Sequence, residues 1–245
     1  MRMDAGPLHY RELNELINAA VRDSGGGGTE VELENVTGQR YIGAGLPGGV
    51  NITVRGVPGN DLGAFMDGAE IAVHGNAQDG VGNTMNAGRI VIHGRAGDIP
   101  GHSMRGGKIL IRGDVGYRAG IHMKACYDRF PVLVIGGSTR DYAGEYMAGG
   151  ILVVMNLGRA PASRKAHYLG TGMHGGTIYL RGPVEPHQLG QEVGVGVCTD
   201  EDGEVLEALL SEYRSEFAVH EGFSPDEFTK VVPKTTRPYG TLYAY

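Results

Sequence analysis

The chain has 245 residues, enough to bury a full core as one domain with short appended segments. It contains 43 glycines but only 11 prolines, and 41% of its residues are hydrophobic, which excludes a collagen triple helix and a disordered glycine-rich chain. The formal net charge of −6 argues against a nucleic-acid or anionic-membrane partner, and no apolar stretch approaches the roughly 20 residues of a membrane span.

The first expected element is a helix over Tyr10–Arg22, because Leu13, Leu16, Ile17, Ala20 and Val21 recur at helical spacing. A glycine run, Gly25–Gly28, follows it as a flexible join. We therefore assign residues 1–28 to an N-terminal helix with a glycine linker.

A repeat of 19 residues dominates the central part of the chain. Short alternating strands begin at Asn51, Glu70, Arg89 and Lys108, and a first coil is expected near Glu30–Gly49. Three sets of residues recur in exact register: Gly56, Gly75, Gly94 and Gly113; Gly63, Gly82, Gly101 and Gly120; and Met66, Met85, Met104 and Met123. One such repeat cannot bury its own apolar face, so successive repeats must stack, with like residues about 4.8 Å apart.

Later coils keep this plan but carry insertions at Lys124–Phe130 and around Asn156–His167. Ile178 begins the strand that closes the series. The sequence therefore predicts an all-β fold, a single-stranded right-handed parallel β-helix of about seven coils over residues 29–183. Isoleucine and valine columns should line its interior, while glycines fill tight turns or close backbone approaches.

The C-terminal segment, residues 184–245, is expected to hold one helix and an extended strap. Val205, Leu206, Leu209, Leu210, Tyr213 and Phe217 form one helical stripe within Gly203–Val219, with Asp200 or Asp202 expected as the N-cap. Such helices would cap the open ends or cover the flanks of the solenoid. The strap from Pro225 onward either docks on a partner or runs back along its own rod.

Candidate chemistry is sparse. The GxGxxG match at Gly43–Gly48 is followed by a strand, whereas dinucleotide binding needs a helix N-terminus there, so turn glycines explain the match. Asn60, Asp79, Asp98 and Asp141 align three residues before repeat glycines, where a turn role is favoured over acid–base work. His102, His122, His167 and His174 lack metal-ligand spacing. We expect no catalytic, cofactor-binding or metal-binding residue in this chain.

The candidate partner-contact residues are basic and fall in two groups. Arg55, His74, His93 and Arg112 occupy one position in consecutive coils, where a solvated outer face is favoured and a partner contact comes next. The second group lies in the two insertions, which break the repeat and should protrude: Lys124, Arg129, Arg159 and Arg164.

The repeat motifs resemble the GXGXG domain, the C-terminal β-helix of the glutamate synthase large subunit. The resemblance rests on such segments as Gly38-Gln-Arg-Tyr-Ile-Gly-Ala-Gly-Leu, Asn76-Ala-Gln-Asp-Gly-Val-Gly-Asn-Thr-Met, Gly116-Tyr-Arg-Ala-Gly-Ile-His-Met-Lys and Gly170-Thr-Gly-Met-His-Gly-Gly, within roughly residues 30–182. The whole chain is similar to stand-alone glutamate synthase domain 3 proteins, found where the large subunit is split into separate chains.

This resemblance implies a non-catalytic scaffold that braces a glutaminase-type amidotransferase chain and a synthase chain carrying FMN and an iron–sulfur cluster. Those cofactors would belong to the partner chains, since Cys126 and Cys198 alone cannot ligate a cluster. Related β-helices form one subunit of formylmethanofuran dehydrogenase and one of N-methylglutamate synthase, and both alternatives stay open. An independent β-helix enzyme and a homo-oligomer are further possibilities, and the expected location is the cytoplasm.

Overall fold

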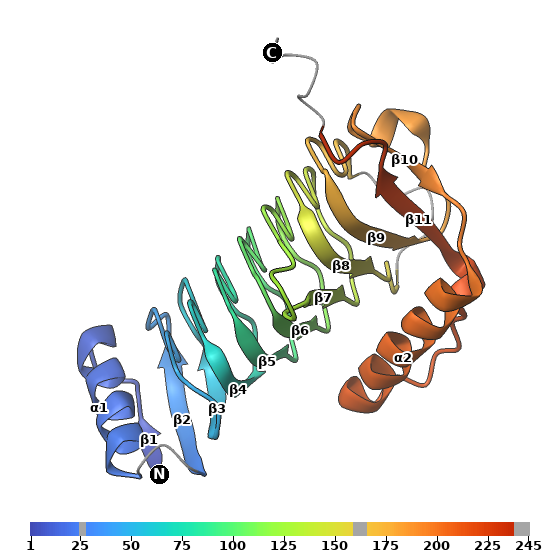
Figure 1. The fold of residues 1–245 in the computed structure, drawn as a ribbon. Helices are drawn as coiled ribbons and strands as arrows, with labels where there is room; N and C mark the ends of the chain where they lie inside the picture. The colour runs from blue at the N-terminus through green and yellow to red at the C-terminus, as the bar shows by residue number, and fades with distance from the viewer. Residues whose placement is uncertain (25–27, 159–165, 238–245) are drawn as a thin grey trace, which may run out of the picture.

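The computed structural model describes residues 1–24, 28–158 and 166–237, and it forms a parallel β-helix with one continuous sheet along its length (Figure 1). Strands β1 to β9 are parallel neighbours in chain order. Their bounds are β1 Arg2–Asp4, β2 Thr29–Thr37, β3 Val50–Val57, β4 Asp67–His74, β5 Ala87–Ile92, β6 Gly107–Ile111, β7 Pro131–Ile135, β8 Ala148–Val154 and β9 Gly175–Arg181.

The register of the sheet confirms the predicted internal ladders. One buried column runs in pairs through Val31, Ile52, Ile71, Ile90, Ile109, Leu133, Leu152 and Ile178. The expected methionines are fully buried beside it. Regular turns number about six, slightly fewer than the seven predicted. Stacking of like on like is therefore what holds the solenoid together.

One corner of each coil explains the glycine that every repeat carries. In the coil before β4, Asp61, Gly63 and Phe65 all have positive φ, at alternate positions. Only the middle position is glycine in every coil, because a Cβ on Gly63 would lie 2.5 Å from Cδ1 of Ile90. The flanking positions accept larger residues in most coils, in spite of the backbone strain that this conformation imposes on L-residues.

The glycine that follows each early strand has a different reason. Gly75 does not have a positive φ, but a Cβ there would lie 2.2 Å from the carbonyl oxygen of Gly56 in the preceding coil. At this column, two backbones approach too closely for any side chain.

Helix α1, Tyr10–Asp23, lies at the N-terminal end of the rod (Figure 1). It turns Leu13, Ile17 and Val21 into the main core, and Leu16 from the predicted stripe is 39% exposed. The predicted helix is confirmed to within one residue. It closes an end at which the stacked ladders would otherwise face water.

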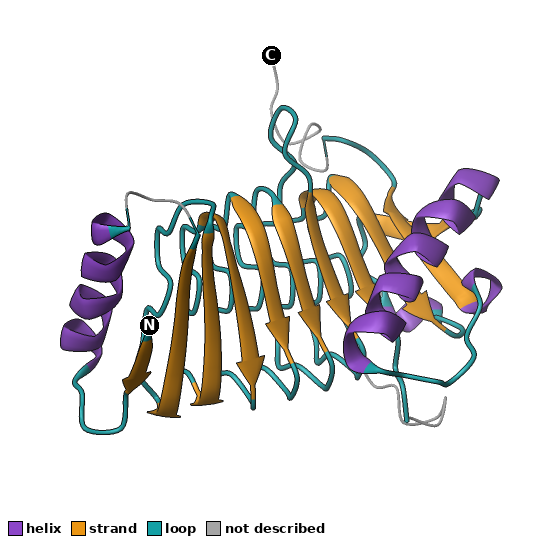
Figure 2. Ribbon diagram, turned by 90° about the horizontal axis from the view of Figure 1, so that it is seen from below, coloured by secondary structure: helices purple, strands orange, loops and turns teal. Residues whose placement is uncertain are grey.

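Helix α2, Asp200–Phe217, lies across the outer face of the sheet (Figure 2). It makes a second core in which Leu206, Leu210 and Tyr213 pack on outward-facing residues of β5 to β9 and on Met155, which follows β8. The strand residues are Val91, Leu110, Val132, Val134, Val153 and Tyr179. The expected N-cap was wrong: Thr199 caps the helix, and Asp202 is the third helical residue of a capping box.

The chain ends in two antiparallel strands at the far edge of the sheet. Strand β11, Phe228–Pro233, pairs with β9, and β10, Val193–Gly196, pairs with β11. Two short 3₁₀ turns, Pro186–Gln188 and Pro225–Glu227, connect these elements. The described part of the strap therefore runs along its own rod, while residues 238–245 lie outside the described residues.

Over the described parts of the chain, neither helix combines the length and apolar character needed to span a bilayer.

Candidate interaction surfaces

The first group of predicted contact residues lies in one row on the outer face of the sheet. Arg55 pairs in register with His74, and the rings of His74 and His93 stack at a centroid distance of 4.7 Å. The sequence reasoning therefore brought together residues that are neighbours in space. Their surroundings differ along the row, because α2 covers only part of the face.

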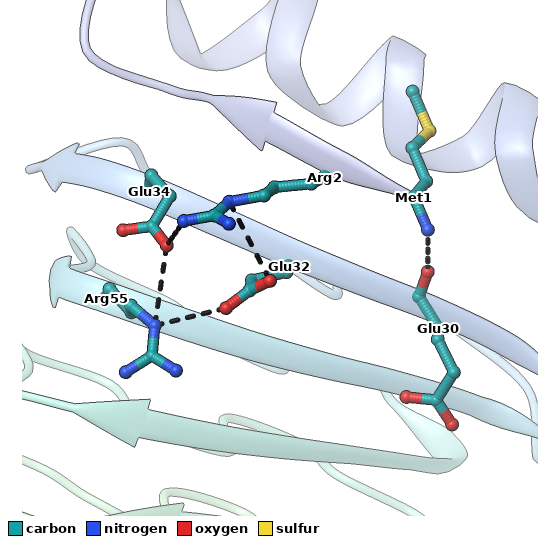
Figure 3. Close-up of polar contacts among 6 residues, drawn as sticks. All are labelled: Met1, Arg2, Glu30, Glu32, Glu34 and Arg55. Atoms are coloured by element: carbon teal, nitrogen blue, oxygen red, sulfur yellow. Dashed lines mark hydrogen bonds and ion pairs between the residues drawn. The ribbon is translucent and has the colours of Figure 1, made fainter.

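Arg55, at the N-terminal end of the row, is held by carboxylates of β2. Its Nε lies 3.1 Å from Oε1 of Glu32 and 3.4 Å from Oε1 of Glu34 (Figure 3). Arg2 of β1 approaches the same pair, with Nη2 at 2.8 Å from Oε1 of Glu34. These contacts fasten the first strands across the ladder, although exposed ion pairs add little stability individually.

His93 lies where α2 ends. Its ring meets Phe217 edge-on at 5.3 Å, and its Nε2 is 3.8 Å from Oε1 of Glu216. Burial, and then the neighbouring His74, lower the pKa of His93, with Glu216 acting in the opposite direction. Arg112 keeps an exposed side chain, while its backbone carbonyl accepts a hydrogen bond of 2.9 Å from the Tyr213 hydroxyl. Of the row, only His93 is partly buried; Arg55, His74 and Arg112 are exposed, and Arg55 is ion-paired.

Sequence reasoning missed the charges that bind α2 to the sheet. Arg89 donates to Glu216 at 2.6 Å and lies 3.3 Å from Glu212, and Lys108 also pairs with Glu212. A signal was present, since Arg89 and Lys108 share one outward position and the two glutamates are four residues apart on one helix.

Asp202 joins three elements at the start of α2. Its carboxylate accepts hydrogen bonds from the Tyr179 hydroxyl of β9, from Lys230 Nζ of β11 at 2.7 Å, and from the Thr199 backbone at 2.7 Å. Burial alone would raise the pKa of Asp202, but the bonds from Lys230, Tyr179 and Thr199 outweigh it and hold that pKa below its usual range. The site is a fastening point of the fold.

The aligned turn residues also serve structure. The Asp79 carboxylate accepts the Asp98 backbone N–H at 2.8 Å, and the Asp98 carboxylate accepts that of Tyr117 at 2.8 Å. Asp141 accepts the His167 N–H at 2.9 Å, and Asn60 that of Asp79 at 3.4 Å. Each of these side chains accepts a backbone hydrogen bond at a turn, and the donor lies in the next coil.

The insertion Lys124–Phe130 forms a short hairpin at the edge where the strands begin (Figure 2). The Arg129 guanidinium lies 3.2 Å from Oδ1 of Asp67, whereas Lys124 is exposed and makes no ion pair with any described residue. Arg159 and Arg164, in the other insertion, lie outside the described residues.

The described residues include no group of three His, Cys, Asp or Glu side chains that could hold a metal. A hollow of about 340 Å³ lies near the end of the solenoid, lined by such residues as Arg140, Asp141 and Asn156, and no described histidine lines it. Cys126 and Cys198 are free thiols. Four thiolates are needed for an iron–sulfur cluster, so the residues of this chain do not fit one.

Comparison with known proteins agrees with this architecture. The uncharacterized protein MJ1350 of Methanocaldococcus jannaschii is 46% identical over 249 residues, covering 98% of this chain and 95% of that protein. The GXGXG motif family matches residues 13–234, which include most of α1, all of α2 and strands β2 to β11. The chain therefore belongs to the GXGXG motif family, that of the β-helix domain of the glutamate synthase large subunit.

Proposed function

We propose that this protein is a non-catalytic structural subunit of a split glutamate synthase or a related glutamine amidotransferase complex. In this proposal it braces a glutaminase-type chain and a chain that carries FMN and an iron–sulfur cluster. The main support is the family match over residues 13–234 in a chain that holds only two cysteines. The chemistry of such a complex would have to come from other chains.

The ladder architecture suits a brace. Each coil is bonded to the next through the sheet and through side chains such as Asp79 and Asp98. A solenoid built of nearest-neighbour contacts is long and offers extended surfaces to partners. Several of its polar side chains bind one part of the chain to another: Asp79 binds the next coil, Arg89 binds α2 to the sheet, and Asp202 binds α2 to β11.

The test is affinity purification of the tagged chain from its native cells. The tag belongs at the C-terminus, because the N-terminal amine bonds to the Glu30 carbonyl at 2.5 Å and Arg2 is ion-paired. We expect a glutaminase chain and a flavin-containing chain in fixed ratio, with visible flavin absorbance. The complex should form glutamate from glutamine and 2-oxoglutarate, whereas the isolated chain should be inactive.

Three other results would redirect the proposal. Co-purification with a molybdenum or tungsten protein would favour the formylmethanofuran dehydrogenase type of assembly. A product methylated on nitrogen would favour N-methylglutamate synthase. A single chain with its own glutamine turnover would end the scaffold interpretation altogether.

A further inference from the structure

The hairpin of residues 124–130 presents an aromatic side chain in an unusual way. Tyr127 is fully exposed, with a relative exposure of 102%, and its φ is +55°. The other tyrosines with positive φ each contact another aromatic ring: Tyr41, Tyr142, Tyr146 and Tyr168. Tyr127 makes no ring contact with any described residue, so its side chain is free to contact another molecule.

The hairpin is held in place at its base. Cys126 and Arg129 exchange two backbone hydrogen bonds of 3.0 Å each. The Arg129 side chain reaches back along the rod to Asp67, and its Cβ packs closely over Gly106, where a Cβ would lie only 3.0 Å away. A preorganised anchor of this kind loses less conformational entropy on binding than a floppy loop would.

Further exposed aromatic and basic residues lie near the base of the hairpin, where Arg129 contacts Asp67 and Gly106, while Asp128 follows Tyr127 at the tip. Phe130 is 52% exposed, and Phe65, in the same coil as Asp67, is 58% exposed. Arg105 and Lys124 follow the buried methionines of consecutive coils, are exposed, and make no ion pair with a described residue. Aromatic side chains flanked by arginine are typical of the residues that dominate binding at protein interfaces.

We propose that this hairpin is a docking element that inserts Tyr127 and Phe130 into an apolar pocket, rimmed by carboxylates, on a different polypeptide chain. The inference rests on the proposed function, in that it needs a partner chain. Unpaired Arg105 and Lys124 would meet the acidic rim, in a chain whose own net charge is −6.

A second copy of this chain is a poorer occupant because its hollow beside α1 has the wrong lining. That hollow, about 270 Å³, is lined by charged groups of both signs and by amides, among them Arg11, Asn14, Glu15 and Asn18. It is therefore not an apolar pocket rimmed by carboxylates alone.

The test compares variants within the native complex. Tyr127→Ala with Phe130→Ala should lower the recovery or affinity of the partner by about tenfold or more, as expected for anchor residues. Tyr168→Ala is the matched control, because Tyr168 is 52% exposed and also has positive φ, yet lies in another coil. Lys124→Glu with Arg105→Glu should weaken binding and reduce its salt dependence.

A photo-crosslinking residue at position 127 would identify what the tip touches. An adduct with an acidic, apolar segment of another chain supports the proposal, while an adduct with this same chain overturns it. Equal binding of the Tyr127→Ala variant and wild type would also overturn it. If the wild-type chain retrieves no partner, the proposed function fails, whereas an intact complex indifferent to the hairpin variants removes only this inference.

Discussion

At the level of single residues, the corner glycines show what a repeat can and cannot reveal. The columns of Gly63 and Gly75 were predictable from spacing, together with the two reasons for having glycine there. The flanking positions were not predictable, because residues as different as Asp61, Phe65 and Tyr142 share one left-handed conformation there. Stacking of each coil on its neighbours imposes that backbone whatever the side chain is.

Gly75→Ala should destabilise the protein by about 2–3 kcal/mol, because the new Cβ would meet the Gly56 carbonyl oxygen at 2.2 Å and neither backbone can move alone. The control is Gly203→Ala in α2, where nothing lies within 4 Å of the added atom. That change should raise stability by up to about 1 kcal/mol through helix propensity. Urea unfolding midpoints would check both, and equal midpoints would refute the close-approach argument.

His93 should make the seating of α2 sensitive to pH. Its pKa in the folded protein is below the ordinary 6.5, so the unfolded chain binds more protons once the pH falls through about 6.5. The contribution of the neutral His93 imidazole to the free energy of unfolding is therefore fully present above pH 6.5 and is lost as the pH falls below it. The charged or titratable groups facing it are His74, Arg89, Arg112 and Glu216.

The expected result is that His93→Gln flattens the fall in unfolding free energy between pH 7.5 and pH 5.5, measured by urea unfolding. His220→Gln is the control, because His220 is exposed. If the two variants show the same pH profile as wild type, the helix end does not depend on the charge of His93.

At the level of elements, α2 was predicted as a helix but its position was left open between an end and a flank. The outer row of the sheet carried the missing signal. It runs from Glu32, Thr53 and Ala72 in early strands to Val91 and Tyr179 in later ones, so its second half needs an apolar cover. The alternation within each strand identifies the inward-facing residues well. The change from polar to apolar residues on the outer face appears only when successive strands are aligned with one another.

Asp202→Asn should lower the free energy of unfolding by about 2 kcal/mol, since an amide cannot accept all of the bonds from Tyr179, Lys230 and Thr199 and leaves Lys230 without its carboxylate. Because the pKa of Asp202 is depressed, this contribution is present above about pH 3.8 and disappears as the pH falls through the folded-state value. Asp200→Asn, two residues earlier in the same helix and exposed, should cost much less.

Thermal unfolding at pH 7 and pH 3 would test this prediction. The gap between Asp202→Asn and wild type should narrow at the lower pH. A gap that is the same at both values would mean that the carboxylate charge is not what fastens α2 to β9 and β11.

At the level of the whole molecule, the repeat was enough to predict the fold, but it did not identify the surfaces that bind partners. A period of 19 residues, with insertions that restore it afterwards, leaves few arrangements other than stacked coils. Interaction surfaces depend on the outward residues, which no internal ladder constrains. Arg55 and His93, for instance, proved to be engaged by β2 and α2 within the same chain.

The ends of such a rod are its exposed points, and the N-terminal end offers a direct test. Ile17→Asp would bury an unpaired carboxylate where the native side chain is 1% exposed, at a cost of about 3–5 kcal/mol. We expect α1 to lift from the core, uncovering stacked ladders that then associate with other copies. Light scattering after gel filtration should show a concentration-dependent rise in mass relative to wild type. Leu16→Asp, on the same helix but 39% exposed, should keep the wild-type mass, and if the two variants behave alike α1 is not the element that closes the rod.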